Sequence, residues 1–170
     1  MQDLANKRVL VVGLGVSGRA AAELLRKRQA KVLAIDNADT PALRREADAL
    51  RAAGVDVRLG ARTPPADALD LAVISPGVPT GSALVQELVR RKVPLIGELE
   101  LGYQQSLCLN ISITGTNGKT TTVELVERML THAHRRSVAA GNIGLPLCAV
   151  ADQTRRGPIG VDADVRARPR

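Results

Sequence analysis

The stretch "RVLVVGLGVSGRAAAELLRKR", residues 8–28, indicates how the first half of the chain folds. The Val- and Leu-rich run 8–12 predicts a buried strand, and the apolar spacing of residues 17–28 predicts a helix. Between them lies a Gly-x-Gly-x-x-Gly turn, residues 13–18. A strand that ends in such a turn at a helix start directs backbone N–H groups and the positive end of the helix dipole to one point. The stretch therefore predicts an anion site within a β-α-β unit.

The same alternation continues to about residue 97. Helical patterns follow at 41–54 and 82–92, and a short connecting helix is expected from residue 98 to 106. Alternating buried strands and helices are typical of a parallel, doubly wound sheet, so we predict an α/β fold with a Rossmann-like N-terminal domain over residues 1–97. Short apolar runs predict its other strands at 31–35, 55–59, 71–75 and 93–97.

A second unit begins with the apolar run 109–114 and a second glycine turn, Gly-Thr-Asn-Gly-Lys-Thr. A helix from Thr120 to about Arg135, a strand at 137–141 and a turn with a short helix at 142–152 are expected next. Two strands are too few for a closed parallel sheet. We therefore predict the truncated start of a P-loop-type α/β ATP-binding domain over residues 98–153.

The second turn has the chemistry of a nucleoside triphosphate site. Gly115, Asn117 and Gly118 permit a compact nest of N–H groups, Lys119 supplies a charge for the outer phosphates, and the Thr120 hydroxyl suits magnesium. The loop is shorter than the standard phosphate loop, because Ile113 stands where that pattern has its first glycine.

The first turn leaves alternatives open. Asp36 ends the next strand, where an acidic residue binds a ribose hydroxyl in dinucleotide sites, so residues 13–18 taken alone favour NAD and an oxidoreductase module. A purely structural tight turn is the other alternative.

Composition excludes several classes of function. The 170-residue chain has a net charge of +7 but a single aromatic residue, Tyr103, so aromatic stacking on nucleic-acid bases is nearly excluded. No apolar stretch reaches membrane-spanning length and no signal region is visible. We expect a cytoplasmic monomer that binds small molecules and neither nucleic acid nor membrane.

The stretch 154–170 is rich in Arg, Asp, Gly and Pro and predicts a charged, disordered tail. A premature stop or a shifted reading frame would produce the same composition.

Other polar residues favour structural roles. Glu98 and Glu100 fit the charge preference of a helix start better than a catalytic pair. His132 and His134, two apart, do not share a helix face, which argues against a metal pair. Buried free thiols are expected at Cys108 and Cys148.

Five stretches in this order and spacing resemble the Mur ligases of peptidoglycan synthesis: "VVGLGVSGRAAAELL", "VISPGVP", "GELEL", "ITGTNGKTTT" and "GNIGLPL". The resemblance covers roughly residues 5–150 and is strongest to the branch that joins D-glutamate to UDP-N-acetylmuramoyl-L-alanine. It explains the short loop, which is that family's ATP site, and it implies that the first turn holds UDP rather than NAD.

The resemblance also implies the site residues and the cofactors, ATP and Mg²⁺. Lys119 and Thr120 are the expected catalytic residues, with Thr120 on the metal. The ATP-binding set is Gly115, Thr116, Asn117, Gly118, Lys119, Thr120 and Thr121. The set for the UDP-linked substrate is Leu14, Gly15, Val16, Ser17, Asp36, Asn37, Ser75, Pro76, Gly77 and Asn142.

In the family, a magnesium-binding glutamate, a carbamylated lysine and a third domain follow the last of these stretches. The sequence shows none of them, so a nucleotide-binding fragment without ligase activity is a further hypothesis.

Overall fold

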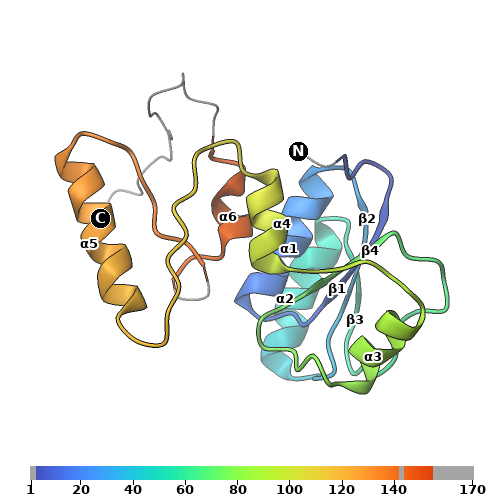
Figure 1. Cartoon of the computed structure of the whole chain (residues 1–170). Helices are drawn as coiled ribbons and strands as arrows, with labels where there is room; N and C mark the ends of the chain where they lie inside the picture. The colour runs from blue at the N-terminus through green and yellow to red at the C-terminus, as the bar shows by residue number, and fades with distance from the viewer. Residues whose placement is uncertain (1–2, 142–143, 155–170) are drawn as a thin grey trace.

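The computed structural model describes residues 3–141 and 144–154 and contains one parallel sheet. Its order is β3-β2-β1-β4-β5, and every neighbouring pair of strands is parallel, which confirms the predicted parallel α/β sheet of a Rossmann-like domain. Figure 1 shows this sheet on one side of the molecule. The strands are β1 (Arg8–Val12), β2 (Lys31–Ile35), β3 (Asp56–Arg58), β4 (Leu71–Ile74) and β5 (Leu95–Gly97).

Helices pack on both faces of the sheet. Side chains of α1 (Val16–Lys27), α2 (Pro41–Ala52) and α4 (Glu98–Gln105) share a core with one face of β1, and α3 (Ala83–Arg90) packs on the other face. The starts of α2 and α3 are capped by hydroxyls, because Thr40 Oγ1 accepts from Leu43 N at 3.2 Å and Ser82 Oγ accepts from Val85 N at 3.4 Å.

The direction of winding reverses between β1 and β4. The chain passes from β1 through α1 to β2, and from β4 through α3 to β5 on the opposite face. In open parallel sheets such a reversal leaves a crevice at the carboxyl ends of the strands, where ligands bind. The first glycine turn and residues 75–77 follow these two strands.

The second unit differs from the prediction in its strands. The helix α5 (Lys119–His132) forms as expected, but the described residues 109–114 and 137–141 form no strand, and only an isolated bridge joins Ala140 to Leu145. A strand is stabilised by a hydrogen-bonded neighbour; among the described residues, 109–114 have none and 137–141 have only the bridge to Leu145. The last helix, α6 (Leu147–Ala151), is short, as expected, and begins directly after Pro146.

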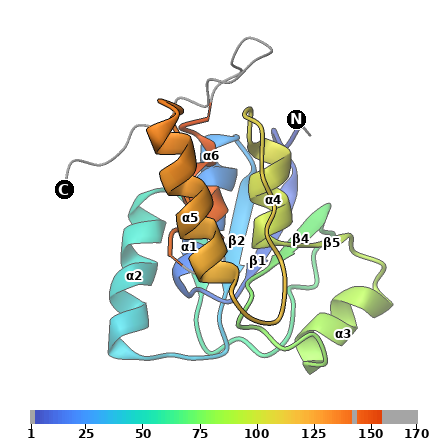
Figure 2. The same ribbon diagram turned by 60° about the vertical axis from the view of Figure 1, so that its left-hand side comes forward.

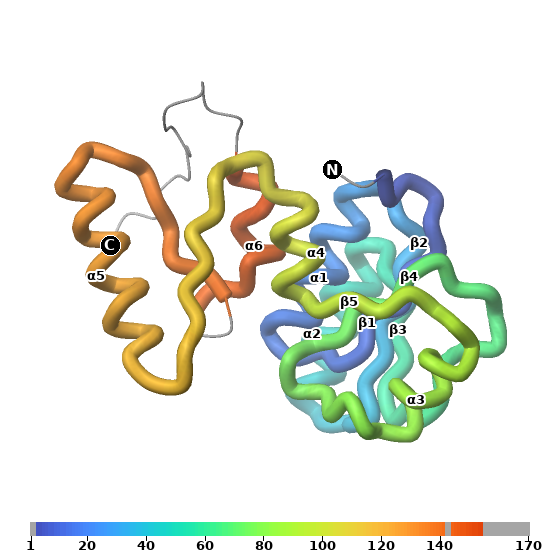
Figure 3. The backbone as a smooth tube through the Cα atoms, in the orientation of Figure 1, coloured from blue at the N-terminus to red at the C-terminus, as the bar shows by residue number. Residues whose placement is uncertain are grey.

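The chain leaves α4, passes through α5 and returns to place α6 against α1 and α4 (Figure 3). Leu101, Cys148 and Ala151 belong to the same core as β1. Gly102 permits this contact, because a Cβ there would lie 2.7 Å from Leu147 Cγ. In contrast, none of the described side chains of α5 is buried, and the helix stands apart from the sheet in Figure 1; Figure 2 shows the same helix from a second side.

Candidate functional site

The glycine turn after β1 folds tightly onto the first turn of α1. Gly13 has a φ of 86° and donates to Ile35 O at 2.8 Å, which ties the turn to β2. A Cβ on Gly18 would lie 1.8 Å from Gly13 O. Only glycine permits this approach. The motif therefore requires glycine at position 18 for lack of space and at position 13 for its positive φ.

Side chains from two other loops fasten this turn. Ser75, after β4, donates its hydroxyl to Gly13 O at 2.7 Å. Asp36, after β2, accepts from Leu14 N at 2.7 Å with Oδ2 and from Ala38 N at 2.8 Å with Oδ1. The loops after β1, β2 and β4 therefore form one connected edge of the sheet.

The start of α1 lies at this edge and can receive an anion. Within the described part of the chain, no side chain caps the helix and no acidic residue stands in its first turn. Gly15 and Val16 are exposed there, Val16 to 61%. Unpaired N–H groups and the helix dipole at such a position favour a phosphate.

The structure brings most of the residues predicted for the UDP-linked substrate to this edge. Leu14 is a partial exception, because its side chain is buried and its N–H group already donates to Asp36. Asp36 organises the glycine turn, a role that the sequence interpretation missed. Asn142 lies outside the described residues. Gly15, Val16, Ser17, Asn37, Ser75, Pro76 and Gly77 follow the carboxyl ends of β1, β2 and β4, and their contact with a ligand stays a prediction.

The second glycine turn leads directly into α5. Gly118 is the N-cap with a φ of 74°, and Thr122 Oγ1 donates to Gly118 O at 2.9 Å. The Lys119 side chain folds back onto the turn, and its Nζ donates to Gly115 O and, at 3.1 Å, to Thr116 O. The ammonium group thus lies at the loop that the sequence assigns to phosphates.

The predicted metal ligand Thr120 is exposed in the first turn of α5. Its hydroxyl is a hard oxygen donor, which suits Mg²⁺, an ion that retains several waters and takes few protein ligands. Among the described residues, no group of three or more His, Cys, Asp or Glu could hold a metal ion. The role of Thr120 as a magnesium ligand stays a prediction.

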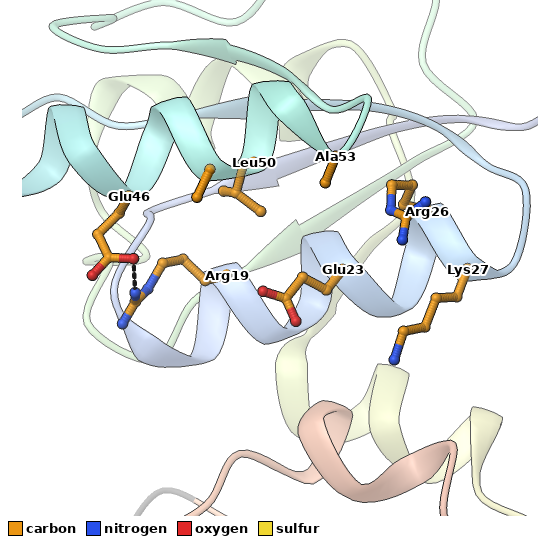
Figure 4. Close-up of a pocket in the computed structure, with 8 residues that line it drawn as sticks. Arg19, Glu23, Arg26, Lys27, Glu46, Leu50 and Ala53 are labelled. Atoms are coloured by element: carbon orange, nitrogen blue, oxygen red, sulfur yellow. Dashed lines mark ion pairs between the residues drawn. The ribbon is translucent and has the colours of Figure 1, made fainter.

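Two hollows lie away from both glycine turns. One, of about 150 Å³, runs between α1 and α2 beside the Arg19–Glu46 ion pair (Figure 4). The other, of about 580 Å³, is lined by residues of β1, β2 and β3 and the segment 65–69. No residue of either glycine turn lines them.

Both cysteines are free thiols, as predicted, although Cys108 is only partly buried. No helix within residues 3–141 and 144–154 has both the length and the apolar character needed to cross a membrane.

Two family models match the chain. The model described as "Mur ligase MurD-like, N-terminal domain" matches residues 7–97, and "Mur ligase middle domain" matches residues 113–167. The second match runs into the stretch predicted as a tail.

Relatives named UDP-N-acetylmuramoylalanine--D-glutamate ligase are similar over most of the chain. The relative from Thermoanaerobacter pseudethanolicus is 39% identical over 156 residues, which are 91% of this chain and 34% of that protein. The relative from Frankia casuarinae is 44% identical over 140 residues, 82% of this chain and 30% of that protein. The chain thus spans about a third of the length of the curated relatives it matches.

Solved structures agree in fold. A murein peptide ligase from Psychrobacter arcticus matches with a TM-score of 0.54 and 23% identity over 80% of this chain and 28% of that one. The UDP-N-acetylmuramate-alanine ligase of Thermotoga maritima matches with a TM-score of 0.50 and 20% identity over 76% of this chain and 30% of that one. Because residues 7–97 alone exceed half of the chain, the match settles the family: this chain belongs to the Mur ligases, with an N-terminal domain of the MurD-like type.

Proposed function

We propose that the chain carries the two nucleotide-binding parts of an ATP-dependent ligase that joins D-glutamate to UDP-N-acetylmuramoyl-L-alanine in peptidoglycan precursor synthesis. The observation that carries the proposal is the connected edge at the carboxyl ends of β1, β2 and β4. It presents the uncapped start of α1 to a diphosphate. The ligands that we assign to the two glycine turns are the ones predicted from the sequence: UDP at the first turn and ATP at the second.

In the reaction of this family, ATP phosphorylates the carboxylate of the substrate's L-alanine, and ADP leaves. The amine of D-glutamate then attacks the acyl carbon, an amide bond forms and phosphate leaves. We assign Lys119 to the outer phosphates, because its ammonium lies at the loop and can exchange the carbonyls of Gly115 and Thr116 for phosphate oxygens. Mg²⁺, held in part by Thr120, would neutralise phosphate charge.

The proposal includes a cytoplasmic monomer that acts on small molecules, because UDP-linked precursors and ATP are metabolites of the cytoplasm. The division of the chain near Gly97 also stays a proposal. The packing of α4 and α6 against α1 attaches parts of residues 98–153 to the first unit. We infer that the ATP-binding part proper lies between these two helices.

Separate calorimetric titrations of the chain with UDP-N-acetylmuramoyl-L-alanine and with ATP and magnesium test the proposal. We expect both ligands to bind, each with a stoichiometry of one, and neither to displace the other, because the two turns lie on different elements. Mutual displacement, or binding of only one of the two, would contradict the assignment of separate nucleotide sites.

A further inference from the structure

The larger of the two hollows, of about 580 Å³, lies toward the amino ends of the strands. Ala30, Lys31 and Gly54 line it, and these residues stand at or just before the starts of β2 and β3. The first glycine turn, in contrast, follows the end of β1. Parallel strands all start at one edge of a sheet and end at the other. The hollow is therefore separate from the proposed UDP site.

The hollow exists because helices cover this face of the sheet incompletely. α3 is the only helix among the described residues that contributes to the core on this face. The described connection from β3 to β4, residues 59–70, contains no helix, and its Leu69 packs against that core. Parallel sheets normally have both faces covered by helices. The face of β2 and β3 therefore keeps a space that a small molecule can enter.

The segment 65–69 forms a wall of the hollow, and Arg91 holds this segment in place. The Arg91 guanidinium donates to three of its backbone carbonyls: that of Pro65, that of Ala66 at 3.2 Å and that of Asp67 at 2.7 Å. From the strand side, Leu33 lines the hollow, and Leu33 and Leu69 are only half-buried. The hollow thus has a fixed wall and an apolar floor.

Arg8 and Lys31 give the hollow a positive charge. The register of the parallel strands β1 and β2 places these two residues side by side. Both are exposed, and neither side chain forms an ion pair or a hydrogen bond with the described residues. Like charges at directly neighbouring strand positions repel each other. An anion between the two side chains would remove that repulsion.

The acidic residues near the hollow leave this charge largely uncompensated. Asp56 pairs with Arg58 at 3.5 Å, and both line the hollow. Asp70 accepts from the backbone N–H group of Arg8 at 2.7 Å. Asp67 is the other carboxylate in the lining, so three cations face two carboxylates there. The excess of one positive charge favours a ligand with a single negative charge.

We propose that this hollow is a second ligand site, which takes a small carboxylate with an apolar body. The carboxylate lies between Arg8 and Lys31, and the body lies against Leu33 and Leu69. A volume of about 580 Å³ falls within the range of small-molecule sites. An inorganic anion would leave the apolar floor uncovered, and a neutral apolar molecule would leave the two cations unpaired. Because the hollow is separate from both glycine turns, the inference is independent of the proposed function.

Octanoate is a suitable probe, because it joins one carboxylate to an apolar chain. The isotope-labelled 170-residue chain would be titrated with octanoate and followed by the backbone amide resonances in NMR spectra. We expect saturable shifts at residues 30–33 and 67–69, with a Kd of about 1 mM, and none at residues 13–18. Acetate, which lacks the chain, should bind at least about tenfold more weakly. Octanol, which lacks the charge, should bind about threefold more weakly.

Two variants test the hollow by independent means. Lys31→Glu reverses one of the two charges and should weaken octanoate about fivefold. Arg45→Glu is the matched control, because it makes the same change at an exposed position on α2 outside the hollow, and it should alter the affinity less than about twofold. Ala68→Trp places a large side chain into the hollow from an exposed position and should weaken octanoate at least about tenfold without any change of charge.

Several results would overturn the proposal. Acetate that binds as tightly as octanoate would show an adventitious ion only, and octanol that binds as tightly would remove the role of Arg8 and Lys31. Shifts centred on α5 would place the apolar chain elsewhere. Full affinity in Ala68→Trp would do the same, and equal losses in Lys31→Glu and Arg45→Glu would show a general effect of charge. The comparison of the three probes uses the wild-type chain, so it decides even where a variant does not fold.

Discussion

The substitution Gly18→Ala is expected to destabilise the chain by about 3 kcal/mol or more, at or above the upper end of ordinary overpacking. The added Cβ would lie 1.8 Å from Gly13 O and 2.6 Å from Ser75 Oγ, so the glycine turn must separate from α1 or the Ser75 contact must break. Helix propensity alone would give the opposite sign, because Ala is favoured over Gly in a helix by about 1 kcal/mol. Urea unfolding followed by circular dichroism measures the difference.

Gly15→Ala is the matched control for this change. A Cβ on Gly15 has no heavy atom within 4 Å, and its φ of −62° suits any residue. Its free energy of unfolding should stay within about 0.5 kcal/mol of the wild type. If Gly18→Ala were as stable as Gly15→Ala, the close approach of the turn to α1 would be wrong.

The substitution Lys119→Ala is expected to weaken ATP binding about 10- to 150-fold, which corresponds to the 1.5–3 kcal/mol of a hydrogen bond to a charged group. The fold should persist, because the side-chain hydrogen bonds of Lys119 to described residues stay within its own turn and Ala is a better helix former. Affinity for UDP should not change, since the first turn lies on α1. Calorimetry with both nucleotides measures the two effects in one preparation.

Arg128→Ala serves as the control for Lys119, because it removes one positive charge from an exposed position on the same helix. Equal losses in the two variants would show a general effect of charge, and full ATP affinity in Lys119→Ala would remove the lysine from the phosphate site.

The first half of the fold follows from local sequence signals. The strands of the sheet and the helices α1 to α4 form within a few residues of their predicted ends, because apolar periodicity, caps such as Thr40 and Ser82, and glycine stops agree with one another. The strand order β3-β2-β1-β4-β5 is one of those found in doubly wound sheets, and right-handed crossovers alone do not select it.

The second unit is less predictable because its elements depend on distant partners. The runs 109–114 and 137–141 have strand-like sequences, yet the described residues pair with them only at the single bridge from Ala140 to Leu145, so the pattern alone does not form a strand. The docking of α6 depends on contacts such as Arg28 with Asp152 and Glu98 with Cys148, which sequence periodicity does not encode.

The sequence predicted which residue types form the candidate site, but not which atoms they contact. The glycine turns and Lys119 carry recognisable motifs, whereas the role of Asp36 depends on which backbone N–H groups come near it. From sequence alone, an acidic residue after the second strand could either bind a ribose hydroxyl or accept a hydrogen bond from the backbone of the glycine turn. The short distance from Asp36 Oδ2 to Leu14 N shows that Asp36 accepts a hydrogen bond from the glycine turn.

Competition between UDP and NAD shows which of the two nucleotides the first glycine turn binds. The 170-residue chain would be titrated with each nucleotide separately and then with NAD in the presence of saturating UDP. We expect UDP to bind more tightly than NAD and to prevent any binding of NAD at this turn, because the edge formed by the loops after β1, β2 and β4 is assigned to a uridine diphosphate. Tighter binding of NAD than of UDP would contradict the account and would favour an oxidoreductase module instead.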